Sequence, residues 1–286
     1  MKVKSRVLMA GAIVAIAGIV MLLILTLTRP PLEIEAHNAA LMDSSSGQLL
    51  FGQREHEHSS PGSLTKLMTI YLIYDRVAQG KLYWTEPVQV SRRAAAIDGS
   101  KVGLKETEVL DVESLLYCIA LPSGGDAALA MGEHLAGTEA NFVELMNRTA
   151  ADLGMKDTHY TNIPGFDSPQ HFSSAYDLSL LARHLVEHFP DILRVSSQME
   201  TTISRQVNGE KISTVLRNTN TLIPLYRGCN GLKTGHTIGA GYCLCATAQR
   251  QEAKLIAVVM GAESIENREQ ETVKMLDYGF DSLHAN

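Results

Sequence analysis

One stretch decides how this chain is interpreted: Ser63-Leu64-Thr65-Lys66-Leu67-Met68-Thr69-Ile70-Tyr71-Leu72-Ile73-Tyr74. It follows Pro61-Gly62 and meets no helix breaker before Gly80, so it predicts a largely buried helix that begins near Ser63. Residues three apart share one face of a helix, so the Lys66 amine can meet the Ser63 hydroxyl. A serine is a good nucleophile only when a neighbouring base takes its proton. A lysine can be that base if its surroundings lower its pKa.

The Ser-x-x-Lys pair is weak evidence by itself, because average residue usage predicts about one such pair by chance in a chain of this length. The competing interpretation is a capped helix start with a solvated lysine. A second candidate site is Lys233-Thr234-Gly235, just before an apolar strand pair. A lysine followed by a hydroxyl residue can bind a carboxylate, and Gly235 permits close approach of a ligand to the backbone. The alternative is an ordinary turn before a strand.

The third candidate, Ser123-Gly124-Gly125, lies on a predicted loop between two helices. Alone it would be read as a connection. The three elements together, in this order, are the signature set of serine β-lactamases and penicillin-binding proteins.

In the rest of the chain, the hydrophobic pattern predicts strands near both ends with helices between them. Apolar runs 39–43 and 49–51 flank Ser44-Ser45-Ser46-Gly47 and predict a hairpin, and Asn208-Gly209 is a strong turn signal between strands 201–204 and 212–216. Further strands are predicted at 241–249 and 253–260, and helices at 111–121, 126–135, 177–189 and 264–283. This order is typical of an α+β (mixed) fold, a sheet packed against helices with a helical cluster inserted.

The chain resembles the low-molecular-mass D-alanyl-D-alanine carboxypeptidases, the S11 peptidases, over roughly residues 37 to 285. The stretches that carry the resemblance are 61–69, 123–128, 165–167, 171–177, 231–237 and 241–243. The resemblance implies a β-lactamase/transpeptidase-like fold, an antiparallel sheet flanked by helices with an all-helical subdomain. It makes residues 37–286 the catalytic domain.

The resemblance also implies an acyl-transfer mechanism on the D-Ala-D-Ala end of the peptidoglycan stem peptide, with β-lactams as inhibitors and neither a metal nor a cofactor. Ser63 would be the nucleophile, Lys66 its base and Ser123 the proton relay toward the leaving amine. The substrate-binding residues would be Lys233, Thr234, Gly235 and His236, with Thr234 on the terminal carboxylate. The backbone amides of Ser63 and His236 would form the oxyanion hole.

One position departs from the family pattern. The third residue of the serine loop is usually asparagine and here it is Gly125. This removes a side-chain amide able to hold Lys66 and the substrate backbone, whereas relay through Ser123 survives. We expect activity, and we keep as an alternative a wall-binding protein that lost turnover.

The first residues predict a membrane anchor. Lys2, Lys4 and Arg6 precede an uncharged run, Val7 to Thr28, long enough at helical rise to cover roughly 30 Å of hydrocarbon. We expect a cytoplasmic tail at 1–6, a transmembrane helix at 7–28 and a linker at 29–36, with residues 32 onward outside the cytoplasm. A signal peptide is the alternative, but its apolar part is usually about 7–15 residues and ends in a small-x-small site. Many relatives continue into a small β domain and a C-terminal amphipathic anchor, and here we expect the N-terminal helix to anchor the chain.

Composition and motifs leave few other classes open. Net charge is −6, without a basic block beyond the first residues, so a nucleic-acid partner is not expected. A class A β-lactamase needs a glutamate about 35–45 residues beyond the serine loop, and residues 155–170 contain none. His184-Leu185-Val186-Glu187-His188 matches a zinc-peptidase pattern, but it lies on the flank of a predicted helix whose core face is elsewhere. The cysteines are expected to be buried free thiols, with a disulfide as the alternative: Cys118, Cys229, Cys243 and Cys245.

Overall fold

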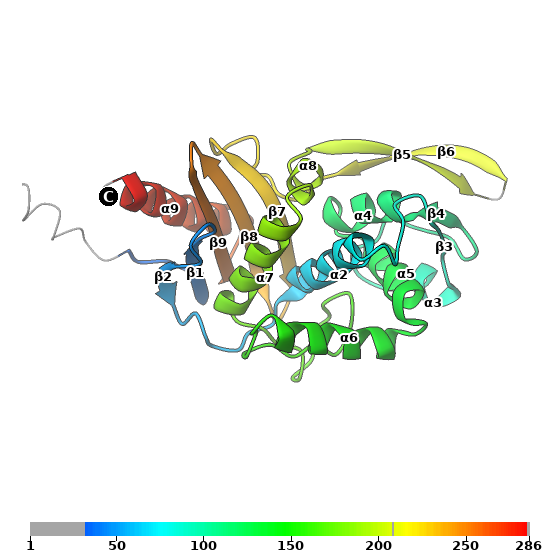
Figure 1. Cartoon of the computed structure of the whole chain (residues 1–286), viewed down its shortest axis with the longest axis horizontal. Coiled ribbons are helices and arrows are strands. Elements are labelled where there is room, and N and C mark those ends of the chain that lie inside the picture. Colours follow the sequence, from blue (N-terminus) through cyan, green and yellow to red (C-terminus); the bar gives the residue numbers. More distant parts are fainter. Residues whose placement is uncertain (1–31, 208, 285–286) are drawn as a thin grey trace, which may run out of the picture. The chain divides into compact units, whose positions relative to one another are not determined.

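The five-stranded antiparallel sheet at the centre of the fold joins the two ends of the sequence (Figure 1). Its strand order is β2-β1-β9-β8-β7. The strands are β1 (Asn38–Asp43), β2 (Leu49–Gln53), β7 (Cys229–Thr237), β8 (Gly241–Arg250) and β9 (Ala253–Ala262). Strand β1 pairs with β9, with Leu41 opposite Ala257, so the N-terminal hairpin completes a sheet begun by the C-terminal strands.

This description comes from a computed structural model that covers residues 32–207 and 209–284. The expected tail at 1–6, transmembrane helix at 7–28, most of the linker and Asn208 of the expected turn lie outside the described residues. Within the described ranges, no helix has both the length and the apolar character needed to cross a membrane.

Helices cover both faces of the sheet, because each presents one apolar stripe. Helix α9 (Ile265–His284) lies on one face, and α7 (Ala175–His188) lies on the other with α2 (Lys66–Ala78) beside it (Figure 1). The predicted core face of α7 is confirmed at Leu178, Leu181, Ala182 and Leu185, which are buried, whereas Phe189, the fifth predicted residue, is only half-buried. Spacings of three and four residues place such side chains on one side of a helix.

The remaining helices form a cluster around α2. They are α3 (Arg92–Ala95), α4 (Val112–Ala120), α5 (Gly125–Ala136), α6 (Glu139–Asp152) and α8 (Ile192–Ser196). Helix α6 was not predicted, although Phe142, Met146 and Ala150 are buried at a spacing of four. Its N-cap, Thr138, accepts a hydrogen bond from the Asn141 amide, the usual way to satisfy a free N–H at a helix start.

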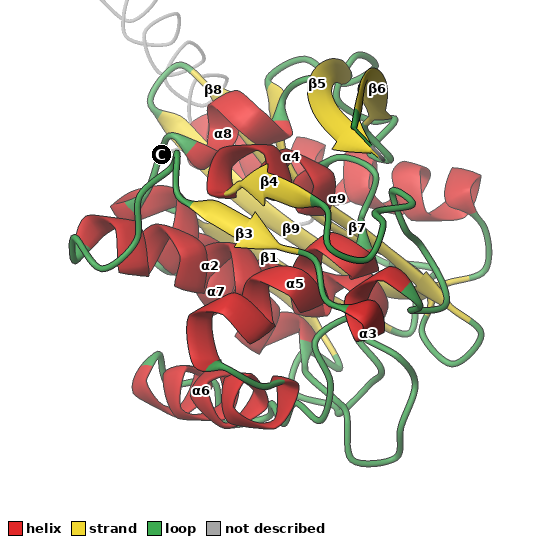
Figure 2. Cartoon of the chain, turned by 90° about the vertical axis from the view of Figure 1, so that its right-hand side faces the viewer, coloured by secondary structure: helices red, strands yellow, loops and turns green. Residues whose placement is uncertain are grey.

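Two short sheets stand apart from the main one: β3 (Pro87–Gln89) with β4 (Val109–Asp111), and β5 (Glu200–Val207) with β6 (Glu210–Arg217) (Figure 2). The predicted hairpins are confirmed as β1–β2 and β5–β6, and so is the mixed fold of helices on an antiparallel sheet. The four cysteines are free and buried, as expected.

Two local predictions need correction. The helix at Ser63 begins as a 3₁₀ turn, η1 (Gly62–Thr65), and becomes α-helical only from Lys66. Lys233-Thr234-Gly235 precedes the β8–β9 pair, as predicted, but it lies inside a strand of its own, β7, which is the edge strand of the sheet. The three residues were missed as strand because two of the common strand signals, alternation and β-branching, are sparse there.

Candidate active site

The Ser63 hydroxyl and the Lys66 amine are in contact. Lys66 Nζ donates a hydrogen bond to Ser63 Oγ over 2.8 Å and a second to the Pro164 carbonyl oxygen over 2.7 Å. Lys66 is only 2% exposed. Burial lowers the pKa of Lys66 to about 7, and the charge of Asp126 opposes part of this fall. The amine is therefore neutral in a large fraction of molecules near pH 7 and can accept a proton from the serine.

Strand β7 lies directly against the turn that carries the nucleophile. A Cβ on Gly235 would stand 3.0 Å from the Pro61 carbonyl oxygen and 3.2 Å from the Ser63 amide nitrogen, so a side chain there would push the two backbones apart by a few tenths of an ångström. A Cβ on Gly62 would stand 3.4 Å from the His236 amide nitrogen. The backbones of Ser63 and His236 thus flank one small space. The amide of Ser63 belongs to a first helical turn, where N–H groups have no intrahelical partner.

Lys233 is the second buried amine of the site. It is 1% exposed, and its Nζ donates to the Thr234 carbonyl oxygen over 2.9 Å. Burial, with smaller contributions from the charges of Lys66 and Arg268, lowers the pKa of Lys233 well below its usual value. Thr234 Oγ1 is 2.6 Å from the hydroxyl of Thr219, whose amide donates to the Leu121 carbonyl oxygen. Thr219 therefore links β7 to the chain just before the Ser123 loop.

Ser123 has a strained backbone and an unused hydroxyl. Its φ is +64°, which is rare outside glycine and is maintained only where the surrounding structure enforces it. The side chain is buried, and its Oγ makes no hydrogen bond with any residue in the described ranges. Asp126 fixes the neighbouring segment, because its carboxylate accepts hydrogen bonds from the amides of Val102, Gly103 and Leu104.

A cleft of about 460 Å³ opens at the nucleophile. It is lined by Ser63, Lys66, Asp98, Gly99, Ser100, Pro164, Gly165, Phe166, His236, Thr237 and Ile238. The structure thus brings Ser63, Lys66 and His236 to one surface. Ser123, Lys233 and Thr234 do not line this cavity. Thr219 joins Thr234 to Leu121, near the Ser123 loop, and the charge of Lys66 acts on Lys233.

The loop after Pro164 fits tightly under the nucleophile. Gly165 has φ +86°, and a Cβ there would lie 2.0 Å from the Gly62 carbonyl oxygen. Asp167 joins three segments: its Oδ1 accepts from the hydroxyls of Ser60 and Thr237 at 2.6 Å each, and its Oδ2 accepts from the Gly239 amide at 2.9 Å. Burial alone would raise the pKa of Asp167, but these hydrogen bonds outweigh it and lower the pKa.

His171 contacts the 3₁₀ turn η1 through Thr65, and its imidazole ring is neutral. Burial, with a smaller contribution from His159, lowers the pKa of His171 to about 4. Its Nδ1 accepts a hydrogen bond from the Thr161 amide over 3.0 Å. The proton of the neutral ring is therefore on Nε2, which donates to Thr65 Oγ1 over 2.8 Å.

Comparison with known proteins identifies the family of this site. The family model described as D-alanyl-D-alanine carboxypeptidase, peptidase family S11, matches residues 25–264. The chain belongs to this family.

Curated relatives of this S11 chain include DacF of Bacillus subtilis, 37% identical over 246 residues, and DacD of Escherichia coli, 38% identical over 258 residues. Both are named D-alanyl-D-alanine carboxypeptidases. The matches cover 86% and 88% of this chain but only 62% and 64% of the relatives, so the chain spans less than two thirds of their length. A solved structure of Penicillin-Binding Protein D2 from Listeria monocytogenes in its ampicillin-bound form superposes with a TM-score of 0.76 at 31% identity, covering 88% of this chain and all of that one.

Gly125 of this S11 chain stands in the first turn of α5. Its amide donates to the Ser100 carbonyl oxygen over 2.7 Å, and a Cβ would lie 3.0 Å from that oxygen. The Pro164 Cβ would lie 3.7 Å from the same added Cβ, so the two neighbours leave little room for a side chain here. The second partner of Lys66 is the Pro164 carbonyl, rather than a side-chain amide.

The rival zinc pattern does not assemble into a site. Glu187 accepts a hydrogen bond from the Ser44 hydroxyl over 2.7 Å, and the rings of His184 and His188 stack on each other at 5.5 Å. In the ranges that the structure describes, no three His, Cys, Asp or Glu side chains are grouped as metal ligands would be. For the class A β-lactamase alternative, the only carboxylate lining the Ser63 cleft in these ranges is Asp98.

Sequence reasoning missed several residues of this S11 site. Asp167 and His171 lie within stretches that carried the family resemblance, but no local pattern revealed their partners. Thr219 and the Pro164 carbonyl had no signal, because a single threonine or a backbone oxygen has no spacing rule. Asp126, directly after the serine loop, could have been found as a carboxylate at a helix N-terminus.

Proposed function

We propose that this chain is a serine-type D-Ala-D-Ala carboxypeptidase that removes the terminal D-alanine from peptidoglycan pentapeptides and is acylated by penicillin at Ser63. The observation that carries the proposal is the buried Lys66 amine, 2.8 Å from Ser63 Oγ with a pKa near 7. Such a pair combines a nucleophile with a base poised at the working pH. The ampicillin-bound Listeria relative supports β-lactams as ligands.

In the proposed mechanism, Ser63 Oγ attacks the carbonyl carbon between the two D-alanines and Lys66 Nζ takes its proton. The amides of Ser63 and His236 donate to the oxyanion. The C–N bond then breaks, and the Ser123 hydroxyl relays a proton to the leaving D-alanine amine. Thr234, beside Gly235, binds the terminal carboxylate, whose negative charge favours the protonated form of the buried Lys233, and in that form Lys233 supplies positive field. Water finally hydrolyses the ester and restores Ser63, with no metal or cofactor required by these steps.

The test measures D-alanine release from a diacetyl-Lys-D-Ala-D-Ala peptide with and without penicillin. We expect release that penicillin abolishes and EDTA spares. Ser63→Ala should lose release and labelling by fluorescent penicillin, whereas Ser213→Ala, on an exposed position of β6, should retain both. Labelling that persists in Ser63→Ala would reject the nucleophile.

Gly125 motivates a second candidate function, a penicillin- and wall-binding protein with little turnover. The family's usual side-chain amide is missing, and the Ser100 carbonyl oxygen would lie 3.0 Å from a Cβ at this position. The same assay separates the two functions, because labelling of Ser63 without D-alanine release would favour the binding protein.

We also propose that residues 7–28 hold the protein in the bacterial cell membrane as a single span, with the catalytic domain on the extracytoplasmic side. The support is the uncharged run behind Lys2, Lys4 and Arg6. Carbonate-washed membranes should retain a chain whose intact mass includes residue 1. A released chain of lower mass would indicate a cleaved signal peptide instead.

A further inference from the structure

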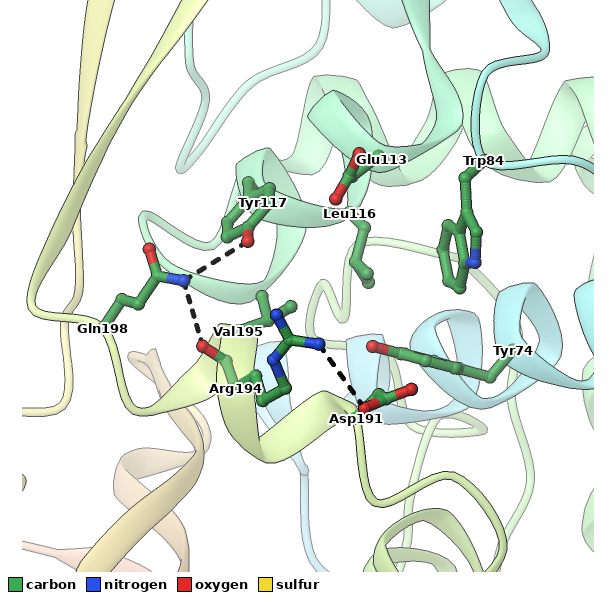
Figure 3. A pocket seen from close by; sticks show the side chains of 9 residues that line it. All are labelled: Tyr74, Trp84, Glu113, Leu116, Tyr117, Asp191, Arg194, Val195 and Gln198. Carbon is green, nitrogen blue, oxygen red and sulfur yellow. Dashed lines mark hydrogen bonds and ion pairs between the residues drawn. The ribbon is translucent and has the colours of Figure 1, made fainter.

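A second pocket, of about 200 Å³, lies between α2, α4 and α8 and shares no residue with the Ser63 cleft (Figure 3). Its volume is about seven times the share of one water molecule in the liquid, ~30 Å³. The space is therefore large enough to hold one ring-sized group.

Tyr74 presents to this pocket a hydroxyl that has no described protein partner. The residue is 6% exposed, yet its hydroxyl, which points into the pocket, forms no hydrogen bond with any residue in the described ranges (Figure 3). Its ring is fixed by an edge contact with Trp84, 5.1 Å between centroids, and by stacking on Phe189 at 5.7 Å. Burial, with the charge of Asp191, raises the pKa of Tyr74, so the hydroxyl stays protonated as a donor. The hydroxyl is thus a rigidly held donor that opens on the pocket, where a ligand can accept its hydrogen bond in place of water.

The other walls supply acceptors, further donors and an apolar floor. Glu113 and Asp191 contribute carboxylates, and the Arg194 guanidinium lies 3.9 Å from Asp191 (Figure 3). The floor is apolar, formed by the buried side chains of Leu116 and Val195. Among the described residues, the indole N–H of Trp84 likewise has no partner.

The combination of hydrogen-bond donors, acceptors and an apolar floor indicates which class of ligand the pocket can bind. An ammonium group has donors only, so it would leave Tyr74 and Arg194 unmatched. An anion would be repelled by Glu113 and Asp191. A neutral ring bearing hydroxyl and acetamide groups offers both donors and acceptors, its C–H face can lie on an aromatic ring, and its methyl group can rest on Leu116 and Val195.

We infer that this pocket binds one N-acetylated sugar ring, as found in the glycan strand of the cell wall. The choice of wall glycan rests on the proposed function, whereas the pocket chemistry does not. A glycan bound here would hold the enzyme on its polymeric substrate while Ser63 acts on stem peptides.

The chain carries its own probe, because Trp84 is its single tryptophan. We would titrate the full chain with N,N′-diacetylchitobiose and follow tryptophan fluorescence, with cellobiose, which lacks acetamide groups, as the matched sugar. The expected result is a saturable change with the N-acetylated sugar and a much weaker one with cellobiose. Tyr74→Phe should weaken binding by about 3- to 10-fold, the effect of one hydrogen bond. It should leave folding intact, because the hydroxyl has no described protein partner to lose.

Absence of a saturable change up to about 10 mM sugar, or an unchanged affinity in Tyr74→Phe, would overturn the inference. So would a saturable change with cadaverine and none with sugar, which would assign the pocket to amines. Penicillin labelling and D-alanine release, measured on the same samples, separate this inference from the proposed function. Lost sugar binding with normal release rejects only the sugar site, and lost release with normal sugar binding rejects only the carboxypeptidase.

Discussion

At the scale of single residues, the chemistry depends on the surroundings of Lys66. A solvated lysine is a poor base near pH 7 because it is almost fully protonated. Burial between η1 and the Pro164 carbonyl removes water from the amine and lowers its pKa to about 7. The motif supplies the contact with Ser63, whereas the fold supplies the basicity.

The pH dependence of acylation follows from this pKa. We expect the rate of Ser63 acylation by penicillin to rise with pH and reach half its maximum near pH 7, because only the neutral amine accepts the serine proton. Stopped-flow or fluorescent-penicillin rates between about pH 5 and 9 would measure it. A flat profile over this range would contradict Lys66 as the base.

The lowered pKa of Lys66 also makes the free energy of unfolding depend on pH. The folded pKa lies below the ordinary value of 10.5, so the unfolded chain binds the extra proton between about pH 7 and 10.5. The contribution of Lys66 to stability therefore rises with pH across that window, and the full penalty of charging the buried amine applies below it.

A second prediction at this scale concerns Gly125. Gly125→Asn restores a side-chain amide, and we expect deacylation and D-alanine release to rise by up to about 10-fold. The Ser100 carbonyl must move by a few tenths of an ångström, because the new Cβ would lie 3.0 Å from it. Gly125→Ala is the matched control, with the same steric demand and no amide. Equal kcat values for the two variants would show that the amide is not what limits turnover.

At the scale of elements, the site is a contact between η1, β7 and the 164–167 loop. Both β7 and the loop come close to η1 where they carry a glycine, Gly235 on the strand and Gly165 on the loop. Asp167 then ties the loop to Ser60 and to the β7–β8 turn by hydrogen bonds to Thr237 and Gly239. Such close backbone contacts transmit small shifts, because packed interiors are poorly compressible.

Gly165→Ala tests this contact. Its Cβ would lie 2.0 Å from the Gly62 carbonyl oxygen, so we expect η1 to be displaced and acylation to fall by about 100-fold or more. Gly154→Ala is the control: it also has positive φ, +78°, but nothing lies within 4 Å of its Cβ, so only about 1 kcal/mol of backbone strain is expected. Acylation rates and urea unfolding of both variants give the answer. Normal acylation in Gly165→Ala would mean that the loop does not position the nucleophile.

At the scale of the whole molecule, a buried ion pair attaches the β5–β6 hairpin to the helical part. Arg205 Nε and Nη2 donate to Glu108 over 2.6 and 2.8 Å, and both side chains are at most 5% exposed. Arg205 also donates to the Gly103 carbonyl oxygen, beside the amides that Asp126 holds. The hairpin is thereby connected to the segment next to the serine loop.

Breaking this pair should be costly. We expect Arg205→Met to lower the free energy of unfolding by about 3–5 kcal/mol, because it leaves the Glu108 carboxylate buried without its partner. The double variant Arg205→Met/Glu108→Leu should recover most of the loss, since no charge remains unpaired. Urea denaturation of the single and double variants measures both values. Additive losses in the double variant would show that the two residues act independently.

The sequence by itself determined the local elements, and through the family resemblance it predicted the chemical roles. Periodicity located α4, α7 and α9, a run without helix breakers located α2, and turn residues located both hairpins. These signals depend on neighbours within a few positions. The order of Ser63-x-x-Lys66, Ser123 and Lys233-Thr234-Gly235 indicated the reaction class.

Only the tertiary structure decided which distant residues complete the site. Strand β1 pairs with β9, and Lys66 donates to the Pro164 carbonyl oxygen. The Thr219 hydroxyl contacts Thr234, and Asp167 accepts hydrogen bonds from Ser60, Thr237 and Gly239. Several of these contacts join positions far apart in the chain. No local pattern encodes such contacts, and a pKa set by burial exists only after the chain has excluded water from the amine. The Ser63–Lys66 pair could thus be found in the sequence, but its activation had to be found in the fold.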